Sequence, residues 1–302
     1  MARLARAPSA EVHGVLAVDK PEGPTSHDLV AGARRLYGTR AVGHAGTLDP
    51  MATGVLLLLF GEATKLSGYL LGEDKRYRAE ISFGRSTDTL DALGRVTEEA
   101  SLAPDWLAPG ALEAALDAER ARAEQLPPAF SAIKLAGEPA HRRARRGDPP
   151  ELAPRAVRVR ALELVARSAR RLEVELTVEK GYYVRSFARD LGARLGVPSH
   201  LSRLRRLASG DFRVEDAIPW PPPEPVAPLP VAEAARRCLG AAELTPAGAA
   251  RARLGQRLAR EDFAGEPGAG ELRAWLAPDG ALVALGRADG DGYRVGRGFG
   301  PR

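Results

Sequence analysis

Residues 43–54 read GHAGTLDPMATG, and they lead directly into the apolar segment VLLLLF at 55–60. Asp49 is the single carboxylate of this loop, and Pro50 keeps it out of the α region, which leaves Asp49 extended. The three glycines permit tight turns or a close approach of the backbone to a ligand. An isolated Asp-Pro is usually an ordinary turn. The length of this pattern instead favours a rigid loop that presents Asp49, which we predict to be the catalytic residue.

Patterns on both sides of the loop predict a mixture of strands and helices. Residues 16–21 are typical of a short strand, and 25–37 of a helix that Gly38 ends. Residues 76–83 and 172–178 alternate between apolar and polar side chains, as strands do. Strands and helices do not alternate regularly along the chain. We therefore expect an α+β fold with a largely antiparallel central sheet rather than a doubly wound parallel sheet.

A proline-rich stretch separates the last part of the chain from the rest. Residues 219–230 hold seven prolines, which makes them too rigid and too poor in N–H donors for a helix or a central strand. Beyond it, the turn signal Pro-Asp-Gly at 278–280 lies between two apolar runs and predicts a hairpin. We predict a catalytic domain over 1–240, which includes the connector, and a small β-rich domain over 241–302.

Composition argues against several classes of protein. A single cysteine, Cys238, rules out an internal disulfide, and the five histidines lack metal-ligand spacing, so we expect no metal. No apolar run approaches the roughly 20 residues of a membrane helix. The N-terminus has no apolar core of the kind that a signal peptide needs. We therefore expect a cytoplasmic protein with no membrane association.

Positive charge is concentrated in one segment. The chain has a net charge of +5, and residues 134–160 alone hold eight Lys or Arg against three Asp or Glu, which also gives +5. A second cluster of arginines follows at 203–206. Guanidinium groups bind phosphates well, although an ordinary solvated face is the alternative. The arginines that we expect along an RNA backbone are Arg142, Arg143, Arg145, Arg146, Arg205 and Arg206.

Six blocks of sequence occur in a fixed order within residues 13–213. They are KPEGPTSHD at 20–28, the Asp49 loop, KRY at 75–77, QLPPAFSAIK at 125–134, GYYVR at 181–185 and LRR at 204–206. In this order they resemble the motifs of the bacterial tRNA pseudouridine synthase B (TruB) family. The tail beyond residue 243 resembles the PUA-type RNA-binding domain of that family more loosely. Phe130 and His141 depart from the pattern, because the family usually has tyrosine at both places.

The resemblance implies a pseudouridine synthase fold with a PUA-like C-terminal domain. It also implies the isomerisation of the T-loop uridine at position 55 of tRNA to pseudouridine, without a cofactor, with Asp49 as the catalytic carboxylate. Such a carboxylate can add to the sugar or the base, or abstract the C2′ proton to give a glycal-like intermediate. The sequence does not choose between these routes. The expected partner is the T-arm of tRNA, with a monomeric enzyme and no obligatory protein partner.

A base inside an RNA loop must first be flipped out of its stack, at a cost of a few kcal/mol. The resemblance implies that Tyr77 stacks on the flipped base, that Leu204 closes its opposite side and that Tyr183 lines the pocket. These three side chains form the expected base pocket.

Three further residues have implied roles around the pocket. Arg185 lies at a predicted strand-to-helix junction, and the resemblance pairs it with Asp49. His44 would fill the space that the base leaves in the RNA loop. Lys20 would support the pocket or bind a phosphate.

Two other classes of function remain open on the residues alone. One is an RNA-binding chaperone that uses the arginine-rich segment and the C-terminal domain without any chemistry. The other is a hydrolase of nucleosides or glycosides with Asp49 and Asp91 as its pair of carboxyl groups. The hydrolase leaves the arginines without a use, and replacement of Asp49 would distinguish the chaperone from an enzyme.

Overall fold

The computed structural model describes residues 11–103, 105–131, 133–135, 137–148, 150–268 and 270–300. Ala132 of the 125–134 block, the side chain of His141 and the outer ends of both predicted domains lie outside the described residues. The helices are α1 (Ser26–Tyr37), α2 (Ser67–Gly72), α3 (Ala111–Arg120), α4 (Ala140–Arg145), α5 (Val184–Leu195), α6 (Val231–Leu239) and α7 (Pro246–Arg253), with short 3₁₀ helices η1 (Gly61–Leu66), η2 (Val214–Asp216) and η3 (Arg260–Asp262). The strands are β1 (Gly14–Lys20), β2 (Val42–Ala45), β3 (Thr53–Phe60), β4 (Lys75–Phe83), β5 (Arg85–Thr87), β6 (Val96–Glu99), β7 (Glu124–Gln125), β8 (Lys134–Leu135), β9 (Glu138–Pro139), β10 (Arg155–Ala156), β11 (Val159–Arg167), β12 (Arg171–Val178), β13 (Ser199–Ser209), β14 (Phe212–Arg213), β15 (Ile218–Pro219), β16 (Ala241–Glu243), β17 (Arg273–Leu276), β18 (Leu282–Asp289) and β19 (Gly292–Gly298).

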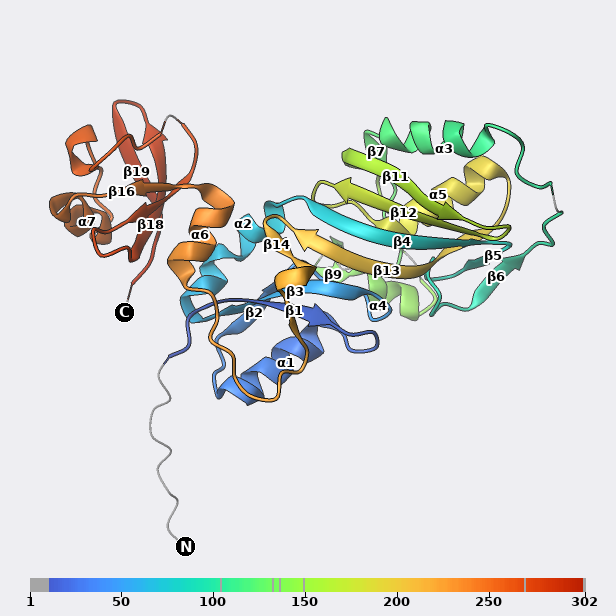
Figure 1. Cartoon of the computed structure of the whole chain (residues 1–302), viewed down its shortest axis with the longest axis horizontal. Coiled ribbons are helices and arrows are strands. Elements are labelled where there is room, and N and C mark those ends of the chain that lie inside the picture. The colour runs from blue at the N-terminus through green and yellow to red at the C-terminus, as the bar shows by residue number, and fades with distance from the viewer. Residues whose placement is uncertain are drawn as a thin grey trace, which may run out of the picture.

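Nine strands of the described residues form one large sheet (Figure 1). Its path is β11-β12-β4-β13-β3-β1-β15, with β14 beside β13 and β2 beside β3. Only the β13–β3 and β1–β15 pairs are parallel among these described strands. The predicted α+β class with a largely antiparallel central sheet is confirmed.

Strand β3 is buried on both faces, which explains why VLLLLF is apolar without interruption. Leu56 and Leu58 pack into the core that α1, α3 and α5 cover. Leu57 and Leu59 point the other way and pack with side chains of α2, α6 and β17. All four leucines are 0% exposed. The loop that precedes β3 is therefore attached to the most deeply buried strand of the sheet.

Helix α1 forms as predicted and begins beside the Asp49 loop. Thr25 and Asp28 make a capping box: the Asp28 N–H donates to Thr25 Oγ1 at 3.1 Å and the Thr25 N–H donates to the Asp28 carboxylate at 2.8 Å. Gly38 ends the helix with φ +65°, in the left-handed region that glycine tolerates. Leu29 and Ala33 face the core.

The proline-rich connector packs back on the catalytic part of the chain. The Tyr37 hydroxyl at the end of α1 donates to the Val226 carbonyl at 2.7 Å and accepts from the Val226 N–H at 3.0 Å. The Trp220 ring lies so close to Gly32 that a Cβ there would be 2.9 Å from it. In Figure 1 the connector runs past α1 before it reaches α6.

The C-terminal part is a small β-rich unit that stands beside the main body in Figure 1. Its four-stranded sheet has the order β16-β17-β18-β19, and the predicted turn at 278–280 joins β17 to β18. Trp275 is fully buried and meets Phe263 edge to face, with 5.3 Å between ring centroids. The expected small β-rich domain is confirmed.

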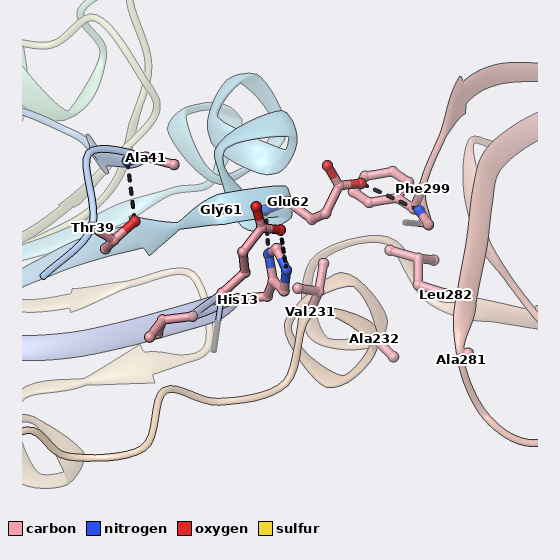
Figure 2. A pocket seen from close by; sticks show the side chains of 13 residues that line it. His13, Thr39, Ala41, Gly61, Glu62, Val231, Ala232, Ala281, Leu282 and Phe299 are labelled. Atoms are coloured by element: carbon pink, nitrogen blue, oxygen red, sulfur yellow. Dashed lines mark hydrogen bonds and ion pairs between the residues drawn. The ribbon is translucent and has the colours of Figure 1, made fainter. Parts of the chain in front are cut away.

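A cavity of about 740 Å³ lies where the two parts meet (Figure 2). Side chains from both parts line it, among them His13, Glu62, Val231, Leu282 and Phe299. The Lys65 ammonium crosses the joint, because it donates to the Gly298 carbonyl at 3.1 Å and lies 5.2 Å from the centre of the Phe299 ring. Asp49 does not line this cavity, so the joint and the Asp49 loop are separate features.

Candidate active site

The Asp49 loop connects β2 to β3 and is fixed by contacts with two other elements. At the start of α1, the Ser26 hydroxyl accepts from the Leu48 N–H at 2.8 Å and donates to the Leu48 carbonyl at 3.1 Å. Gly54 has φ +100°, and a Cβ there would lie 2.1 Å from the carbonyl oxygen of Arg206. Only glycine lets β3 approach β13 this closely. The loop is therefore held between α1 and β13.

Lys20, at the end of β1, supports this loop through hydrogen bonds to its backbone. Its side chain is 0% exposed, and its ammonium donates to the carbonyls of Pro21 at 2.8 Å, Pro50 at 3.2 Å and Ala52 at 2.7 Å. Burial lowers the pKa of Lys20 from 10.5 to about 8, and the nearby Asp49 carboxylate opposes that shift. The resemblance implied that Lys20 either supports the pocket or binds a phosphate. Its contacts with backbone carbonyls favour the supporting role.

Arg206 also holds the loop, and its predicted contact with the RNA backbone is wrong. The side chain is 1% exposed, with Nε donating to the Val55 carbonyl at 2.6 Å and Nη2 to the Gly46 carbonyl at 2.9 Å. A guanidinium enclosed in this way cannot reach a phosphate. Arg205, its neighbour in β13, lies on the other face of the strand, where it binds both oxygens of Asp19 at 2.7 and 3.0 Å.

Asp49 and Arg185 form the central ion pair of the site, as the resemblance implied. Arg185 Nε lies 2.8 Å from Asp49 Oδ2, and Nη2 donates to Oδ1 at 3.0 Å, so one guanidinium holds both carboxylate oxygens. The Arg185 side chain is 7% exposed, whereas that of Asp49 is 31% exposed. The arginine thus lies behind a carboxylate whose other side is open.

Two further donors of Arg185 are bound to backbone carbonyls. Nη1 donates to the Thr89 carbonyl at 3.0 Å and Nη2 to the Phe130 carbonyl at 2.9 Å. A second carboxylate, that of Asp91, lies 3.7 Å from Nε. These contacts hold the guanidinium in one orientation. In that orientation it fixes the position of the Asp49 carboxylate.

Asp91, which the sequence analysis paired with Asp49 only in the hydrolase alternative, is a member of the site. Its side chain is 8% exposed, and its Oδ1 accepts from Thr89 Oγ1 at 2.7 Å and from the Leu93 N–H at 3.1 Å. Leu90 between them has φ +64°, which is unusual outside glycine. The polar loop at 84–94 offered no local signal that its acid would meet Arg185, because that contact joins distant parts of the chain.

Tyr77 and Leu204 lie on neighbouring antiparallel strands. Leu204 of β13 is opposite Ala79 of β4, and Tyr77 is two residues from Ala79, so all three share one face of the sheet. Leu204 is 7% exposed, and the half-buried Tyr77 packs against the same core. The two side chains implied for the base pocket are thus brought to adjacent positions.

Tyr183 and His44 complete the set of implied substrate-binding residues. Tyr183 directly precedes α5, and its side chain is half-buried and hydrogen-bonded to that of Ser131. Burial raises the pKa of its phenol. His44 lies on β2, next to the start of the loop. Burial and then the charge of Arg206 lower the pKa of His44, and no described residue hydrogen-bonds to its buried Nδ1. His44 is therefore held in the neutral form.

The arginine-rich segment has an exposed part and a paired part. Arg142 and Arg145 on α4 are exposed, and no ion pair within the described residues includes them. Arg143 is paired with Asp148 at 2.8 Å, and Arg146 with Glu138 at 2.6 Å. Contact of this segment with RNA stays a prediction.

No helix in the described ranges is long and apolar enough to cross a membrane. Within the same ranges, no three His, Cys, Asp or Glu side chains are grouped so that they could hold a metal ion. The polar network around Asp49 instead consists of carboxylates, cations and backbone carbonyls.

Known proteins resemble this chain over nearly its whole length. A family model described as TruB family pseudouridylate synthase (N terminal domain) matches residues 34–184. The chain is 43% identical over 290 residues to tRNA pseudouridine synthase B of Arthrobacter sp. (strain FB24), which covers 93% of this chain and 94% of the relative. It is 41% identical over 290 residues to the protein of the same name from Xanthomonas axonopodis pv. citri (strain 306), covering 93% and 92%.

Solved structures show the same fold. In a crystal structure of a Cbf5-Nop10-Gar1 complex, one chain is 26% identical and superposes with a TM-score of 0.72, covering 96% of this chain and 86% of its own length. The resemblance in sequence, the expected pseudouridine synthase fold and the relatives therefore agree. The chain belongs to the TruB family of pseudouridylate synthases.

Proposed function

We propose that this pseudouridine synthase converts the T-loop uridine at position 55 of tRNA to pseudouridine, with Asp49 as its catalytic carboxylate. The observation that carries the proposal is the geometry of Asp49. Its two oxygens are held by one buried guanidinium, while 31% of the side chain remains exposed. A carboxylate that is fixed on one side and open on the other is suited to meet a reacting sugar or base.

The reaction needs no atom from outside the nucleotide. The bond from C1′ to N1 breaks, a bond from C1′ to C5 forms, C5 loses its proton and N1 gains one. Asp49 supports either of two routes, addition to the nucleotide or abstraction of the C2′ proton. In both routes the charge on the carboxylate changes during the reaction. Arg185 then keeps the oxygens in place, because it also donates to two backbone carbonyls.

Tyr77 and Leu204 are proposed to hold the flipped base between them. Their adjacent positions on β4 and β13 support this role, since base stacking on an aromatic face offsets part of the cost of flipping. Tyr183 would line the same pocket through its half-buried ring. His44 would enter the space that the base leaves, and its lowered pKa favours a neutral imidazole there.

The T-arm of tRNA is proposed to contact the exposed arginines of the 142–146 segment and the C-terminal unit. Exposed guanidinium groups at Arg142 and Arg145 support this placement. The boundary between domains at 240 and 241, the monomeric state and the cytoplasmic location remain predictions from the sequence. The named relatives act on tRNA according to their names, which agrees with the proposed substrate.

The hydrolase alternative is disfavoured by the surroundings of Asp91. A hydrolase pair needs two carboxyl groups that both face the scissile bond. Asp91 is 8% exposed and lies beside the same arginine that binds Asp49. It therefore acts within the protein and has no open side for a second substrate contact.

Tritium release tests the proposed function and its position in the RNA together. An unmodified tRNA transcript carries uridine labelled at C5, and a second transcript carries cytidine in place of the T-loop uridine. The proposal predicts release of one tritium per tRNA from the first transcript and none from the second. Equal release of tritium from both transcripts would show that the enzyme acts on another uridine. No release from either transcript would favour the RNA-binding chaperone.

A further inference from the structure

The amide of Gln125 makes a closed pair of hydrogen bonds with the backbone of one residue of the site. The Tyr183 N–H donates to Gln125 Oε1 at 2.8 Å, and Gln125 Nε2 donates to the Tyr183 carbonyl at 3.1 Å. Neighbouring residues of an antiparallel sheet exchange bonds in the same way. Gln125 is 2% exposed, so water does not offer Tyr183 an equal replacement. The side chain therefore serves as a single-residue strand partner.

Tyr183 occupies the point at which the chain turns from extended backbone into α5. Its φ and ψ are −113° and 110°, and no side chain caps the helix there. Its carbonyl also accepts the first helical bond, from the Phe187 N–H at 3.1 Å. Arg185 is the second residue of this helix. A change in the backbone of Tyr183 would consequently swing Arg185, whose guanidinium holds Asp49.

The segment that follows Gln125 contacts the same turn of α5. The Leu126 carbonyl accepts from Ser186 Oγ at 2.8 Å, and the Phe130 carbonyl accepts from Arg185 Nη2 at 2.9 Å. Of these contacts, only that of Gln125 fixes the backbone at Tyr183 rather than a side chain further along. Gln125 has no described contact with Asp49 itself.

We propose that Gln125 is a positioning residue for the reaction: through Tyr183 it sets the place of Arg185 and thus of Asp49. This inference rests on the proposed function. It assigns Gln125 to the rate of the chemical step and not to the affinity for RNA, since the side chain is enclosed by protein. Displacement of a catalytic group by about 1 Å can reduce a rate about 100-fold.

Two substitutions of Gln125 separate the effect of its hydrogen bonds from the effect of its size. Gln125→Met keeps the length of the side chain and removes both bonds. Gln125→Glu keeps the acceptor for the Tyr183 N–H, but its carboxylate faces the Tyr183 carbonyl without a proton to share. When that carboxyl group is protonated, its O–H replaces the lost donor and both bonds return. Arg189→Met is the matched control, because the Arg189 guanidinium donates to the Leu126 carbonyl of the same segment at 3.0 Å and to Asp190 at 2.7 Å, and none of its described side-chain hydrogen bonds goes to Tyr183 or Arg185.

Single-turnover tritium release with excess enzyme is measured from pH 8 to pH 6, beside filter binding of tRNA and thermal unfolding. The charged residues near Gln125 include Glu124 on the same strand, Arg155 opposite it on β10, and Arg185 and Arg189 on α5. Division by the wild-type rate at each pH removes the pH effects that both enzymes share. Near pH 8 both variants should be slower by about 10- to 100-fold, with affinity for tRNA within about threefold of wild type. As the pH falls, Gln125→Glu should recover toward the wild-type rate, whereas Gln125→Met should not.

A merely structural role would lower the unfolding temperature without changing the rate of the folded enzyme or its relative pH profile. Rates within twofold of wild type, a loss explained by weaker binding, or a constant ratio for Gln125→Glu would each overturn the inference. If Gln125→Met does not fold, the pH profile of Gln125→Glu decides alone. An inactive wild type would contradict the proposed function instead, so the two failures are distinguishable.

Discussion

Cations do different work in the Asp49 loop and in the 142–146 segment. Around the loop, Lys20, Arg206 and Arg185 are each at most 7% exposed and donate to backbone carbonyls or to a carboxylate. In the segment, Arg142 and Arg145 are exposed and have no ion pair within the described structure. The first group builds the site and the second is available to a phosphate.

The difference shows why a basic sequence is a poor guide to an RNA surface. Arg205 and Arg206 are neighbours in the same motif, yet one is enclosed and the other is bound to Asp19. Buried cations with several hydrogen bonds should control stability and catalytic geometry. Exposed cations should control affinity and its dependence on salt.

Replacement of Arg206 should have the largest effect on stability. Arg206→Met leaves the carbonyls of Gly46 and Val55 without their donors, and buried acceptors without partners are costly. We expect a loss of about 3 kcal/mol in the free energy of unfolding. Urea titration measures it, with the exposed Arg203→Met on the same strand as a control that changes stability by less than about 0.5 kcal/mol. Equal effects of the two substitutions would erase the contrast between buried and exposed arginines.

Arg185→Lys should reduce the rate of the chemical step by about 100-fold with little change in the affinity for tRNA. A lysine ammonium keeps the charge but cannot hold both Asp49 oxygens and the two carbonyls in a fixed plane. Single-turnover rates and equilibrium binding separate the two quantities. A variant that binds tRNA weakly but reacts normally once saturated would assign Arg185 to RNA binding instead.

Lys20 should make stability depend on pH in the alkaline range. Its pKa is about 8 in the folded protein against an ordinary 10.5, so between these values the unfolded chain binds more protons and the free energy of unfolding rises with pH. The rise between pH 8 and pH 10 should be about 2 kcal/mol larger in the wild type than in Lys20→Met. Lys75, whose pKa burial also lowers to about 8, contributes equally to both proteins. Parallel pH profiles would show that Lys20 titrates normally.

The exposed arginines should produce the smallest effect, and it should depend on salt. The double variant Arg142→Ala with Arg145→Ala should weaken tRNA binding by roughly tenfold at low salt. The loss should be smaller at high salt, because binding of the variant releases fewer counterions than binding of the wild type. The slope of log K against log salt should fall by up to about two. Arg167→Ala with Arg170→Ala, at the hairpin between edge strand β11 and β12, removes the same charge elsewhere and serves as the control. Equal losses of tRNA affinity in the two double variants would show that the 142–146 segment does not contact the RNA.

Local patterns were sufficient to predict several elements. The cap at Thr25 and the stop at Gly38 bound α1, and alternation identified β4 and β12, since these signals depend only on neighbours in the sequence. Strand β13 was not predicted as a strand. It carries three arginines, and two register shifts against β4 interrupt its alternation. Its apolar face therefore cannot be read as a simple period of two.

The chemistry of the site was only partly visible in the sequence. The motifs indicated Asp49 and its pairing with Arg185, and the ion pair is present. The burial of Arg206, the approach of Asp91 to Arg185 and the clamp of Gln125 on Tyr183 depend on contacts between distant segments. Nothing in the local pattern distinguishes a buried arginine from an exposed one. These features required the packed structure.

The catalytic role of Asp49 is tested by the single-turnover rate of Asp49→Asn, measured together with its affinity for tRNA. Asparagine keeps the shape of the side chain but removes the carboxylate that acts as base or nucleophile. We expect a rate at least about 10³-fold below wild type, with tRNA binding within about threefold. Normal pseudouridine formation by Asp49→Asn would contradict it, and would leave Asp49 as a turn residue of a loop that Arg206 and Lys20 hold in place.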